Sequence, residues 1–504
     1  MIETIQQAVV PHDQYQIEIK LDYSLLEGKQ THYQISTFMF VPRSLGISPH
    51  NYRKEDFYKD VQNYIRLKTP IFALNDFTTQ VTSPLVILKT LVTAENKSVG
   101  IEKSQVVDNC KLFSAMLKSA VREHIQLIQR RISEAPSDAN VQLMIQSLVE
   151  AFLVESEAIT SEYRALYDHF NLPNVDGELF TAYKLTDESM SLLIEESAIE
   201  IFAIVIEIFK KEKKAKFKSR LNDCAEKEVK YRRAHGYASV LEIDDNENEA
   251  YAFRISVLKK YASSVLYLST ALQREGVGLE QILFALAAGL SMIFATVVAF
   301  YFQAEYGNFT FPFFVALVVG YMFKDRIKEW GRATFSRYLQ NRLFDRRIII
   351  HSQDGKHKLG MLKENVTFVD ETELPQDAVR ARNRSPLTEL DNDGLGEDII
   401  CYTKEIKLYN QAFRKAFHTL PEITGINDII RYDIRAFLNK MDEPVQEKAF
   451  LAKEQLQHAF LAKVYHVNLI TRYRSLMPRQ PKVYRRIRMI LHRTGIKRLE
   501  QVEV

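Results

Sequence analysis

Two runs without charged residues dominate the hydrophobic pattern of this 504-residue chain. Residues Ile282 to Phe302 form a run of 21, and Phe309 to Phe323 form a run of 15. A helix over the first run is about 30 Å long, which matches the hydrocarbon core of a bilayer. The second run reaches only about 22 Å and needs its flanking residues to extend it. The pattern therefore predicts a two-span transmembrane helical hairpin over residues 278–323. A hairpin buried in a soluble core and a re-entrant pair are the alternatives.

The charges around the two runs predict their orientation. The connecting residues 303–308 contain no Lys or Arg, whereas basic residues are frequent after Phe323. Because positive charge accumulates on the cytoplasmic side of a membrane, both termini are expected in the cytoplasm. A basic juxtamembrane helix is expected over residues 324–345. The residues expected to anchor the chain at the membrane interface are Trp330, Tyr321, Tyr338, Arg326, Lys328 and Arg332.

Small residues recur at helical spacing in both runs. They form the pairs Ala285 and Gly289, Ala295 and Ala299, and Ala316 and Gly320. Small residues four positions apart let helix backbones approach closely in a membrane. This spacing is compatible with the two helices packing on each other within one chain, and also with self-association of several chains. Neither run contains an ionisable residue, which argues against a transport path through the helices.

The remaining sequence is predicted to be cytoplasmic and of mixed α+β type. Residues 1–100 are expected to form an α+β domain, with a β-hairpin from 13–26 and 31–42 and a helix over 53–67. Apolar stripes at helical spacing over 101–276 predict a helical bundle whose last helix, 244–276, leads into the hairpin. The hairpin would then respond to movements of the bundle.

After the hairpin, residues 346–504 are expected to form a β-rich α+β domain. Strand signals occur at 346–352, 356–370 and 397–410, and residues 428–441 alternate again. A helix is expected over 444–462. The whole chain is therefore interpreted as an α+β integral membrane protein made of a cytoplasmic helical bundle, a two-helix hairpin and a β-rich module.

Composition and motifs give no catalytic, cofactor-binding or metal-binding candidate. The net charge is only +3, so no global field favours nucleic acid. Phosphate-binding loops, dinucleotide fingerprints and the common hydrolase and zinc motifs are all missing from the sequence. An enzyme whose site assembles from distant residues stays possible, because such a site needs no local motif.

One local charge signal stands out near the C-terminus. Ten basic residues and no acidic residue occur between Arg472 and Arg498. The segment fits a helix or a strand, and in either case one basic face is expected to be free. The residues assigned to this basic surface are Arg485, Arg486, Arg488 and Arg493. Anionic lipid headgroups or an acidic surface of the same chain are the expected partners, ahead of nucleic acid.

These observations favour a non-enzymatic function. The first hypothesis is a membrane-anchored scaffold or sensor that faces the cytoplasm, contacts membrane lipids and self-associates as a homo-oligomer. The second is an oligomeric channel or membrane-perturbing effector that is gated by the helical bundle. The third is an enzyme with an unrecognised cytoplasmic site.

Overall fold

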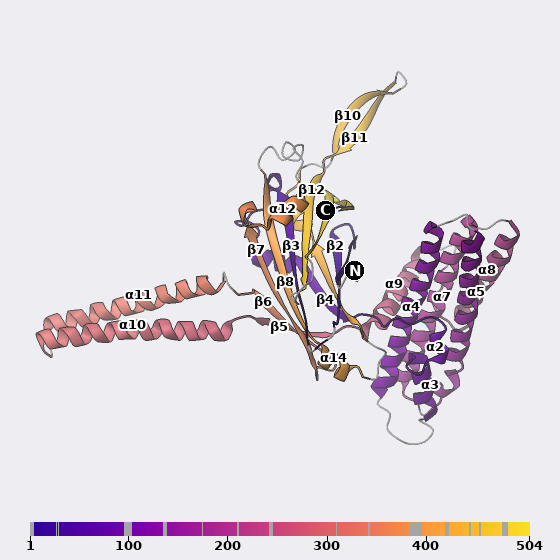
Figure 1. Cartoon of the computed structure of the whole chain (residues 1–504), viewed down its shortest axis with the longest axis horizontal. Coiled ribbons are helices and arrows are strands. Elements are labelled where there is room, and N and C mark those ends of the chain that lie inside the picture. The colour runs from indigo at the N-terminus through magenta and orange to yellow at the C-terminus, as the bar shows by residue number, and fades with distance from the viewer. Residues whose placement is uncertain are drawn as a thin grey trace. The chain divides into compact units, whose positions relative to one another are not determined.

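The computed structural model describes most of the chain as two compact units. The described residues are 5–26, 28, 30–94, 103–134, 139–173, 175–208, 211–240, 245–308, 310–340, 343–383, 396–418, 423–442, 445–452, 455–475 and 482–503. One unit contains residues 1–64, 269–412 and 428–504, and the other contains residues 65–268 and 413–427. Figure 1 shows the mixture of helices and strands, which confirms the α+β class in its coarse form.

An eight-stranded antiparallel sheet is the centre of the first unit. Its strands lie in the order β14-β13-β12-β3-β8-β7-β6-β5. Their bounds are β3 Gln30–Pro42, β5 Ser269–Arg274, β6 Arg346–His351, β7 Lys358–Val369, β8 Glu397–Tyr409, β12 Tyr465–Ser475, β13 Val483–His492 and β14 Gly495–Val502. Buried and half-buried side chains alternate along β8, as expected for a strand with two covered faces.

A smaller sheet packs against one face of the large one. It contains β1 Ile5–Pro11, β2 Gln16–Ser24, β9 Gly425–Asp433 and β4 Val61–Leu67, in the order β1-β2-β9-β4. Between the two sheets lies an enclosed, largely apolar cavity of about 30 Å³. Its lining comes from β2 and β9 on one side and from β3, β8 and β12 on the other. The main hydrophobic core of this unit therefore lies between the two sheets.

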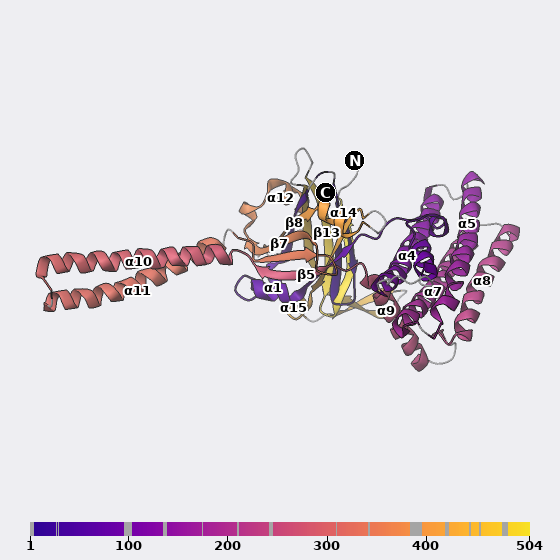
Figure 2. The same ribbon diagram turned by 90° about the horizontal axis from the view of Figure 1, so that it is seen from below.

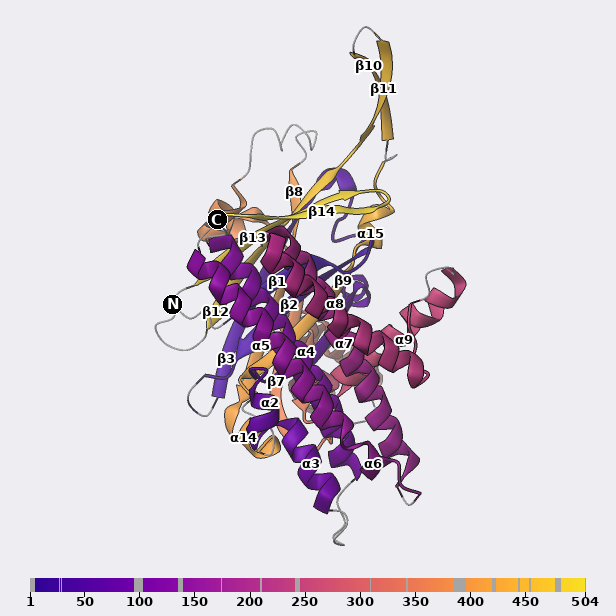
Figure 3. The same cartoon turned by 90° about the vertical axis from the view of Figure 1, so that its right-hand side faces the viewer.

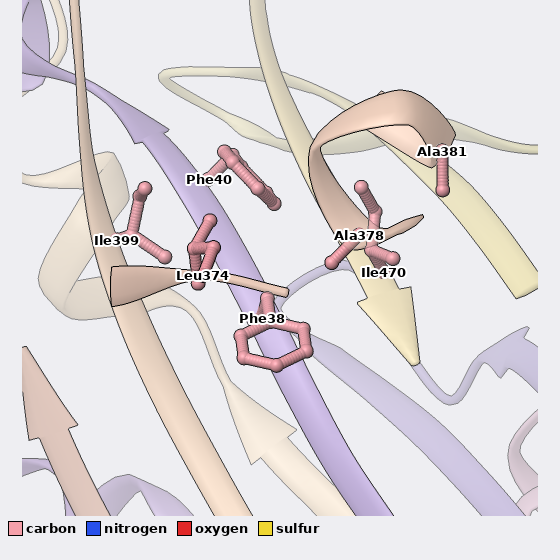
Figure 4. Packing of buried hydrophobic residues seen from close by; sticks show 7 residues of the cluster. All are labelled: Phe38, Phe40, Leu374, Ala378, Ala381, Ile399 and Ile470. Carbon is pink, nitrogen blue, oxygen red and sulfur yellow. The ribbon is translucent and has the colours of Figure 1, made fainter. Parts of the chain in front are cut away.

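The other face of the large sheet is covered near α12 Gln376–Arg382. Here Ala378 and Ala381 pack over Phe40 of β3 and Ile470 of β12, with Ile399, Leu374 and Phe38 beside them (Figure 4). Two alanines on one helix face let the helix lie close to the strands. The other short helices of this unit are η1 Arg43–Leu45, α1 Lys54–Asp60, η3 Glu371–Glu373 and α15 Arg435–Leu438.

The second unit is a helical bundle, shown from one side in Figure 3. Its helices are α2 Asp76–Thr79, α3 Pro84–Ala94, α4 Lys103–Glu134, α5 Ala139–Arg164, α6 Tyr167–Phe170, α7 Gly177–Ile208, α8 Lys211–Ala234 and α9 Asp245–Ser264. The stripe predicted on α4 is buried, including Val106, Phe113 and Leu117. Phe113, Tyr163 and Tyr183 stack with centroids 5.1 Å apart in each pair. The helix α14 Asn410–Ala416 lies at the division between the units.

The grouping of the chain differs from the consecutive domains expected from the sequence. Strand β3 pairs with β8 on one side and with β12 on the other. The N-terminal segment therefore contributes β3 to the same sheet as six strands of residues 346–504, and no boundary between compact units falls near residue 100 or residue 346. Pairing between strands far apart in sequence carries no local signal, so periodicity alone could not reveal it.

The predicted β-hairpin of residues 13–26 and 31–42 is wrong in its pairing. Both segments are strands, β2 and β3, but they belong to different sheets. β2 pairs with β1, and β3 pairs with β8 and β12. The helix expected over 53–67 is also shorter, because α1 ends at Asp60 and the chain continues directly as β4.

Two predicted helices contain strands instead. The helix expected over 244–276 ends with α9 at Ser264, and residues Ser269–Arg274 form the edge strand β5. The helix expected over 444–462 is a two-stranded ribbon of β10 Val445–Ala452 and β11 Gln455–Ala462 (Figure 3). Its exposed side chains include Leu451, Leu456 and Phe460. These side chains give the ribbon an exposed apolar surface. A two-stranded ribbon alone is only marginally stable in water.

Candidate functional site

The most distinctive feature of the first unit is a long helical hairpin inserted between two paired strands. It consists of α10 Val277–Tyr306 and α11 Phe311–Gln340. It follows β5 and precedes β6, and these strands pair from Ser269 with His351 to Arg274 with Arg346. Figure 1 shows the two helices side by side along their length. The hairpin thus replaces the tip of a β-hairpin at the edge of the sheet.

Only one of the two helices has the length and composition of a membrane span. Among the described residues, α10 is long and apolar enough to cross a bilayer, whereas α11 is not. The two spans predicted from the sequence are therefore not confirmed. From Ile282 to Phe300, however, the outward side chains of α10 are exposed and apolar, and they include Ile282, Leu286, Leu290, Ile293, Val297 and Phe300.

The two helices pack antiparallel, as Figure 2 shows from a second direction, and two close contacts give their register. A Cβ atom on Gly320 would lie 3.3 Å from Val298, and one on Gly331 would lie 3.0 Å from Ala287. The separation in sequence between Gly320 and Gly331 on α11 equals that between Ala287 and Val298 on α10. The two helices therefore keep one register between these two contacts. Lys324, four residues after Gly320, is therefore level with Phe294, four residues before Val298.

The predicted small residues divide into two groups. Ala316 and Gly320 are buried between the helices, and Ala295 and Ala299 are half-buried. Ala285 and Gly289 are exposed, and a Cβ atom on Gly289 would meet nothing within 4 Å. The first group fits packing within one chain, whereas the second is open to a partner.

The register divides the hairpin into two halves with different surfaces. The distal half, residues 295–306 and 310–323, has one side chain that is charged at neutral pH, Glu305. In the proximal half, residues 277–294 and 324–340, α10 remains apolar after Glu280 but α11 is charged. The charged residues that lie level with the middle of α10 are Lys324, Asp325, Arg326, Lys328, Glu329 and Arg332.

The residues expected at a membrane interface all lie on the charged half of α11 or next to it. Trp330 is 74% exposed, and Tyr321 and Tyr338 are also exposed. The Lys324 ammonium lies 3.6 Å from the centre of the Tyr321 ring, and Arg332 lies 5.5 Å from that of Phe284 on α10. Lys324 and Arg332 thus rest on aromatic rings, whereas Arg326 is exposed and Lys328 is half-buried.

The charges set a limit on how deeply the hairpin can enter a hydrocarbon layer. A charged side chain at the centre of a membrane helix costs about 2.5–3.5 kcal/mol on insertion scales. Burying an exposed aliphatic side chain contributes at most about 1.5–3 kcal/mol. Full immersion of the run from Ile282 would add six exposed apolar side chains of the proximal half of α10, but would carry in six charges. These apolar side chains are Ile282, Leu286, Leu290, Met292, Ile293 and Phe294. For a single hairpin the charges outweigh this gain.

The base of the hairpin is fixed to the sheet by two buried or half-buried carboxylates. The Glu275 carboxylate, just before α10, forms ion pairs with Arg347 at 3.1 Å and with Lys363 at 2.5 Å. Asp345, after α11, accepts hydrogen bonds from the Lys54 ammonium (2.9 Å) and the Tyr58 hydroxyl (3.1 Å). The backbone N–H of Val366 also donates to Asp345, at 2.9 Å. A movement of the hairpin base would therefore be transmitted to β7 and α1.

Gly276 makes the turn into α10 possible. Its φ is +78°, a value that side chains disfavour, and a Cβ atom there would lie 2.1 Å from the Leu343 side chain. The two ends of the hairpin therefore meet closely at this glycine.

Within the described residues, the C-terminal basic segment contains the end of β12, all of β13 and the start of β14, so it forms strands and not a helix. Arg486 is buried, and its guanidinium donates two hydrogen bonds to the side-chain oxygen of Asn468, at 3.2 and 3.1 Å. Burial, together with the nearby Arg382, lowers the pKa of Arg486 to about 10. Arg486 therefore does not belong to a free basic face, and its assignment to the basic surface from the sequence is wrong.

The other residues of this segment are more accessible. Arg488 is half-buried and lies 3.5 Å from Glu500 of β14, Arg485 is half-buried, and Arg493 is exposed. The basic surface is thus smaller than the sequence suggested.

A buried cluster of charged side chains lies between the two sheets of the first unit and was not predicted from the sequence. The Lys404 ammonium lies 2.5 Å from Asp428 and 3.5 Å from Glu364, and all three side chains are at most 1% exposed. Glu364 also accepts hydrogen bonds from the Tyr402 hydroxyl (2.7 Å) and the Asn63 amide (2.6 Å). Burial raises the pKa of the Asp428 carboxyl, although Lys404 opposes this effect. One cation here faces two carboxylates.

A second cluster of this kind lies inside the helical bundle. Arg164 of α5 holds Glu228 of α8 through two hydrogen bonds of 3.1 and 2.6 Å. It also donates to Asp187 of α7 at 3.2 Å and lies 3.4 Å from the centre of the Tyr231 ring. Burial raises the pKa of Asp187, and Arg164 opposes this effect. Neither cluster has a local sequence signature, because each is assembled from separate elements.

No group of three or more His, Cys, Asp and Glu side chains within the described ranges is placed to hold a metal ion. Comparison with known proteins finds no matching family model, no matching curated protein and no matching solved structure.

Proposed function

We propose that this chain is a membrane-anchored, non-enzymatic scaffold or sensor that self-associates and uses the α10/α11 hairpin as its anchor. The observation that carries the proposal is the exposed apolar surface of this hairpin. Large exposed apolar surfaces on a folded chain mark sites of membrane or protein contact. The distal half is apolar on the outward faces of both helices, and positive charge follows directly at Lys324, Arg326 and Lys328. Lipid is the partner that best fits an apolar tip with a basic base.

The charge pattern also supports a cytoplasmic location for both termini. The hairpin tip, residues 303–308, has no basic residue, whereas the charged half of α11 lies next to the sheet. Entry from the cytoplasmic side keeps the basic residues on that side. The register of the helices favours a position of the hairpin that is shallower than the two-span form of this topology.

Replacing the hairpin should convert the chain to a soluble protein. Because β5 and β6 pair directly, a short Asn-Gly turn can join them in place of residues 277–343. The shortened chain is expected in the supernatant after cell lysis and high-speed centrifugation, whereas the full chain is expected in the membrane pellet and resistant to alkaline extraction. A soluble full chain, or a shortened chain that still pellets with membranes and resists extraction, would contradict the proposal.

The same shortened chain tests the basic segment as a second lipid contact. Each basic residue near an anionic surface contributes about 1 kcal/mol at low salt. If Arg493 contacts lipid headgroups, the shortened chain should bind anionic vesicles in a salt-dependent way, and Arg493→Gln should weaken this binding. Absence of vesicle binding at low salt would limit the lipid contact to the hairpin.

Self-association is proposed to use the outward face of α10 around Gly289. Gly289→Leu should shift the detergent-solubilised protein toward smaller species in native electrophoresis, because a bulky side chain keeps backbones apart. The hairpin itself should stay intact, since nothing lies within 4 Å of the added Cβ atom. Gly320→Leu is the matched control, because its side chain would push against Val298 inside the hairpin and lower thermal stability. An unchanged species distribution in Gly289→Leu would exclude this face as the interface.

A channel is the second candidate, and one observation favours it. In the proximal half, α10 is apolar outward while α11 carries charges on the side away from α10, including Asp325, Arg326 and Glu329. In a ring of hairpins, α10 could face lipid while α11 lined water. Ion conductance of the protein reconstituted in planar bilayers tests this, and its absence with correctly inserted protein would leave the scaffold.

A further inference from the structure

The register of the two helices allows the depth of insertion to be derived. α10 considered alone suggests a complete span, because its uncharged run is about 30 Å long. The partner helix changes this, since Lys324 lies level with Phe294, near the middle of that run. From there, Arg326, Lys328 and Arg332 are level with successively earlier positions of α10, namely Met292, Leu290 and Leu286. A span that contained all of Ile282–Phe302 would carry these basic residues into the hydrocarbon.

We infer that only the distal half of the hairpin enters the bilayer, from the side of the sheet unit, with the charged residues of α11 remaining among the lipid headgroups. This inference rests on the proposed membrane function. From Phe294, which is level with Lys324, α10 continues for twelve residue steps to Tyr306 at the tip, which is about 18 Å. The hydrocarbon core of a bilayer is about 30 Å thick, so the tip would stop near its middle.

The composition of the distal half fits an environment of acyl chains. On α10 the outward side chains include Val297, Phe300 and Tyr301, and on α11 they include Phe314, Val318 and Met322. At the tip, the amide of Gln303 donates to the side-chain oxygen of Asn308 at 2.8 Å, so these two polar groups satisfy each other in part. Glu305 is the one charged residue that would lie deep, compared with six between Lys324 and Arg332 in a complete span. Shallow insertion therefore leaves fewer charges in hydrocarbon.

The headgroup partner is expected to be anionic. Four of the six charged residues from Lys324 to Arg332 are basic. They begin where the apolar half of α11 ends, which is the position that an anionic leaflet would occupy. The apolar proximal face of α10, including Leu286 and Leu290, then lies outside the hydrocarbon core and is available to a second copy, in agreement with the self-association proposed above.

Trp330 gives a direct measurement of depth, because it is the only tryptophan in the chain. It lies six residues beyond Lys324 on the charged side, which places it about 9 Å from the distal half. The full chain is reconstituted in vesicles of phosphatidylcholine and phosphatidylglycerol, in which part of the phosphatidylcholine carries bromine at mid-acyl positions. With shallow insertion, Trp330 fluorescence should be quenched little by these bromines. A matched variant, Trp330→Phe with Tyr321→Trp, moves the reporter into the distal half and should be quenched several-fold more.

The possible results separate the depth from the membrane function itself. Strong quenching of both Trp330 and the Tyr321→Trp reporter would mean that α10 is fully immersed, which overturns the shallow insertion but keeps the membrane anchor. Quenching of neither reporter, with the protein shown to float with the vesicles, would overturn the insertion of the hairpin and the proposed function together. Strong quenching of the Tyr321→Trp reporter alone supports the inference.

A second reporter at the tip keeps the result independent of fluorescence. Asn308→Cys is placed in a chain without Cys110, Cys224 and Cys401, and a membrane-impermeant maleimide is added to either side of sealed vesicles. Shallow insertion predicts no labelling from the side opposite the sheet unit, whereas a two-span hairpin predicts labelling there. Labelling from the opposite side would overturn the inference.

Discussion

Replacing Lys404 by methionine is expected to lower the free energy of unfolding of the sheet unit by about 3–5 kcal/mol at neutral pH. Lys404 is the only cation that the structure places against the buried carboxylates of Asp428 and Glu364, among the described residues. Methionine has a similar length and fills the same space, so the loss arises from the two uncompensated carboxylates. Thermal or urea unfolding in detergent, followed by far-ultraviolet circular dichroism, measures the change.

The deficit of the Lys404→Met variant should depend on pH with a defined sign. Burial already raises the pKa of Asp428 in the folded chain, and removal of the opposing Lys404 raises it further. A carboxyl whose pKa is raised by folding binds more protons in the folded state, so its stability contribution falls as pH rises from the unfolded to the folded pKa. The difference from the parent should therefore shrink as the pH is lowered from 7 toward 5.

Lys407→Met is the matched control, because Lys407 lies on the same strand but on the opposite face, where it is half-buried. It should change stability by less than about 1 kcal/mol and without this dependence on pH. If Lys404→Met is as stable as the control at pH 7, the cluster does not hold two ionised carboxylates and the argument fails.

The sequence predicted the local elements of the sheet better than their partners. Strand signals at 346–352, 356–370 and 397–410 correspond to β6, β7 and β8. The neighbours of β3 could not be predicted, because its partners β8 and β12 lie hundreds of residues away in sequence. The same reason hides the Lys404 cluster, whose members come from β7, β8 and β9.

The segment 444–462 shows where local preference misleads. It is rich in Ala, Leu, Glu, Gln and Lys, which are good helix formers. The structure has a β-ribbon there, with Leu451 opposite Leu456 and Glu447 opposite Phe460. Propensity is a weak guide that tertiary context can override.

For the hairpin, the sequence predicted the helices but not their alignment. The uncharged runs gave α10 and the start of α11, and the basic stretch gave the extension of α11 to Gln340. The level of Lys324 relative to α10 depends on the contacts of Gly320 and Gly331 with Val298 and Ala287. A count of uncharged residues treats each helix separately, and for this reason it suggested two spans.

Replacing Arg164 by methionine is the second change with a large expected effect, and it concerns the helical bundle. Arg164 holds Glu228 and Asp187, both of which are almost completely buried. Without the guanidinium, two carboxylates remain in the bundle with fewer partners, so a loss of about 3–5 kcal/mol is expected. Asp187 keeps the hydroxyl donors of Tyr231 (2.8 Å) and Tyr237 (3.2 Å), whereas Glu228 loses both of its hydrogen bonds from Arg164.

Three further variants show whether the loss comes from charge or from packing. Arg164→Lys keeps the charge but not the two-pronged geometry, and should lose less than Arg164→Met. Adding Glu228→Leu to Arg164→Met should recover part of the loss, because it removes the buried charge that has lost its partner. Arg220→Met, which breaks the half-exposed pair with Glu150, should cost less than about 1 kcal/mol.

The buried thiol of Cys110 allows the bundle to be followed separately from the sheet. Cys110 lies on α4, and burial raises its pKa to about 12, so it should react with thiol reagents only when the bundle opens. In a chain with Cys224→Ser and Cys401→Ser, Arg164→Met should accelerate labelling of Cys110, while Lys404→Met should leave it nearly unchanged. If Arg164→Met labels faster and adding Glu228→Leu does not slow the labelling, the role of Arg164 is its packing against Tyr231. If Arg164→Met and Arg220→Met label at the same rate, the buried network does not stabilise the bundle.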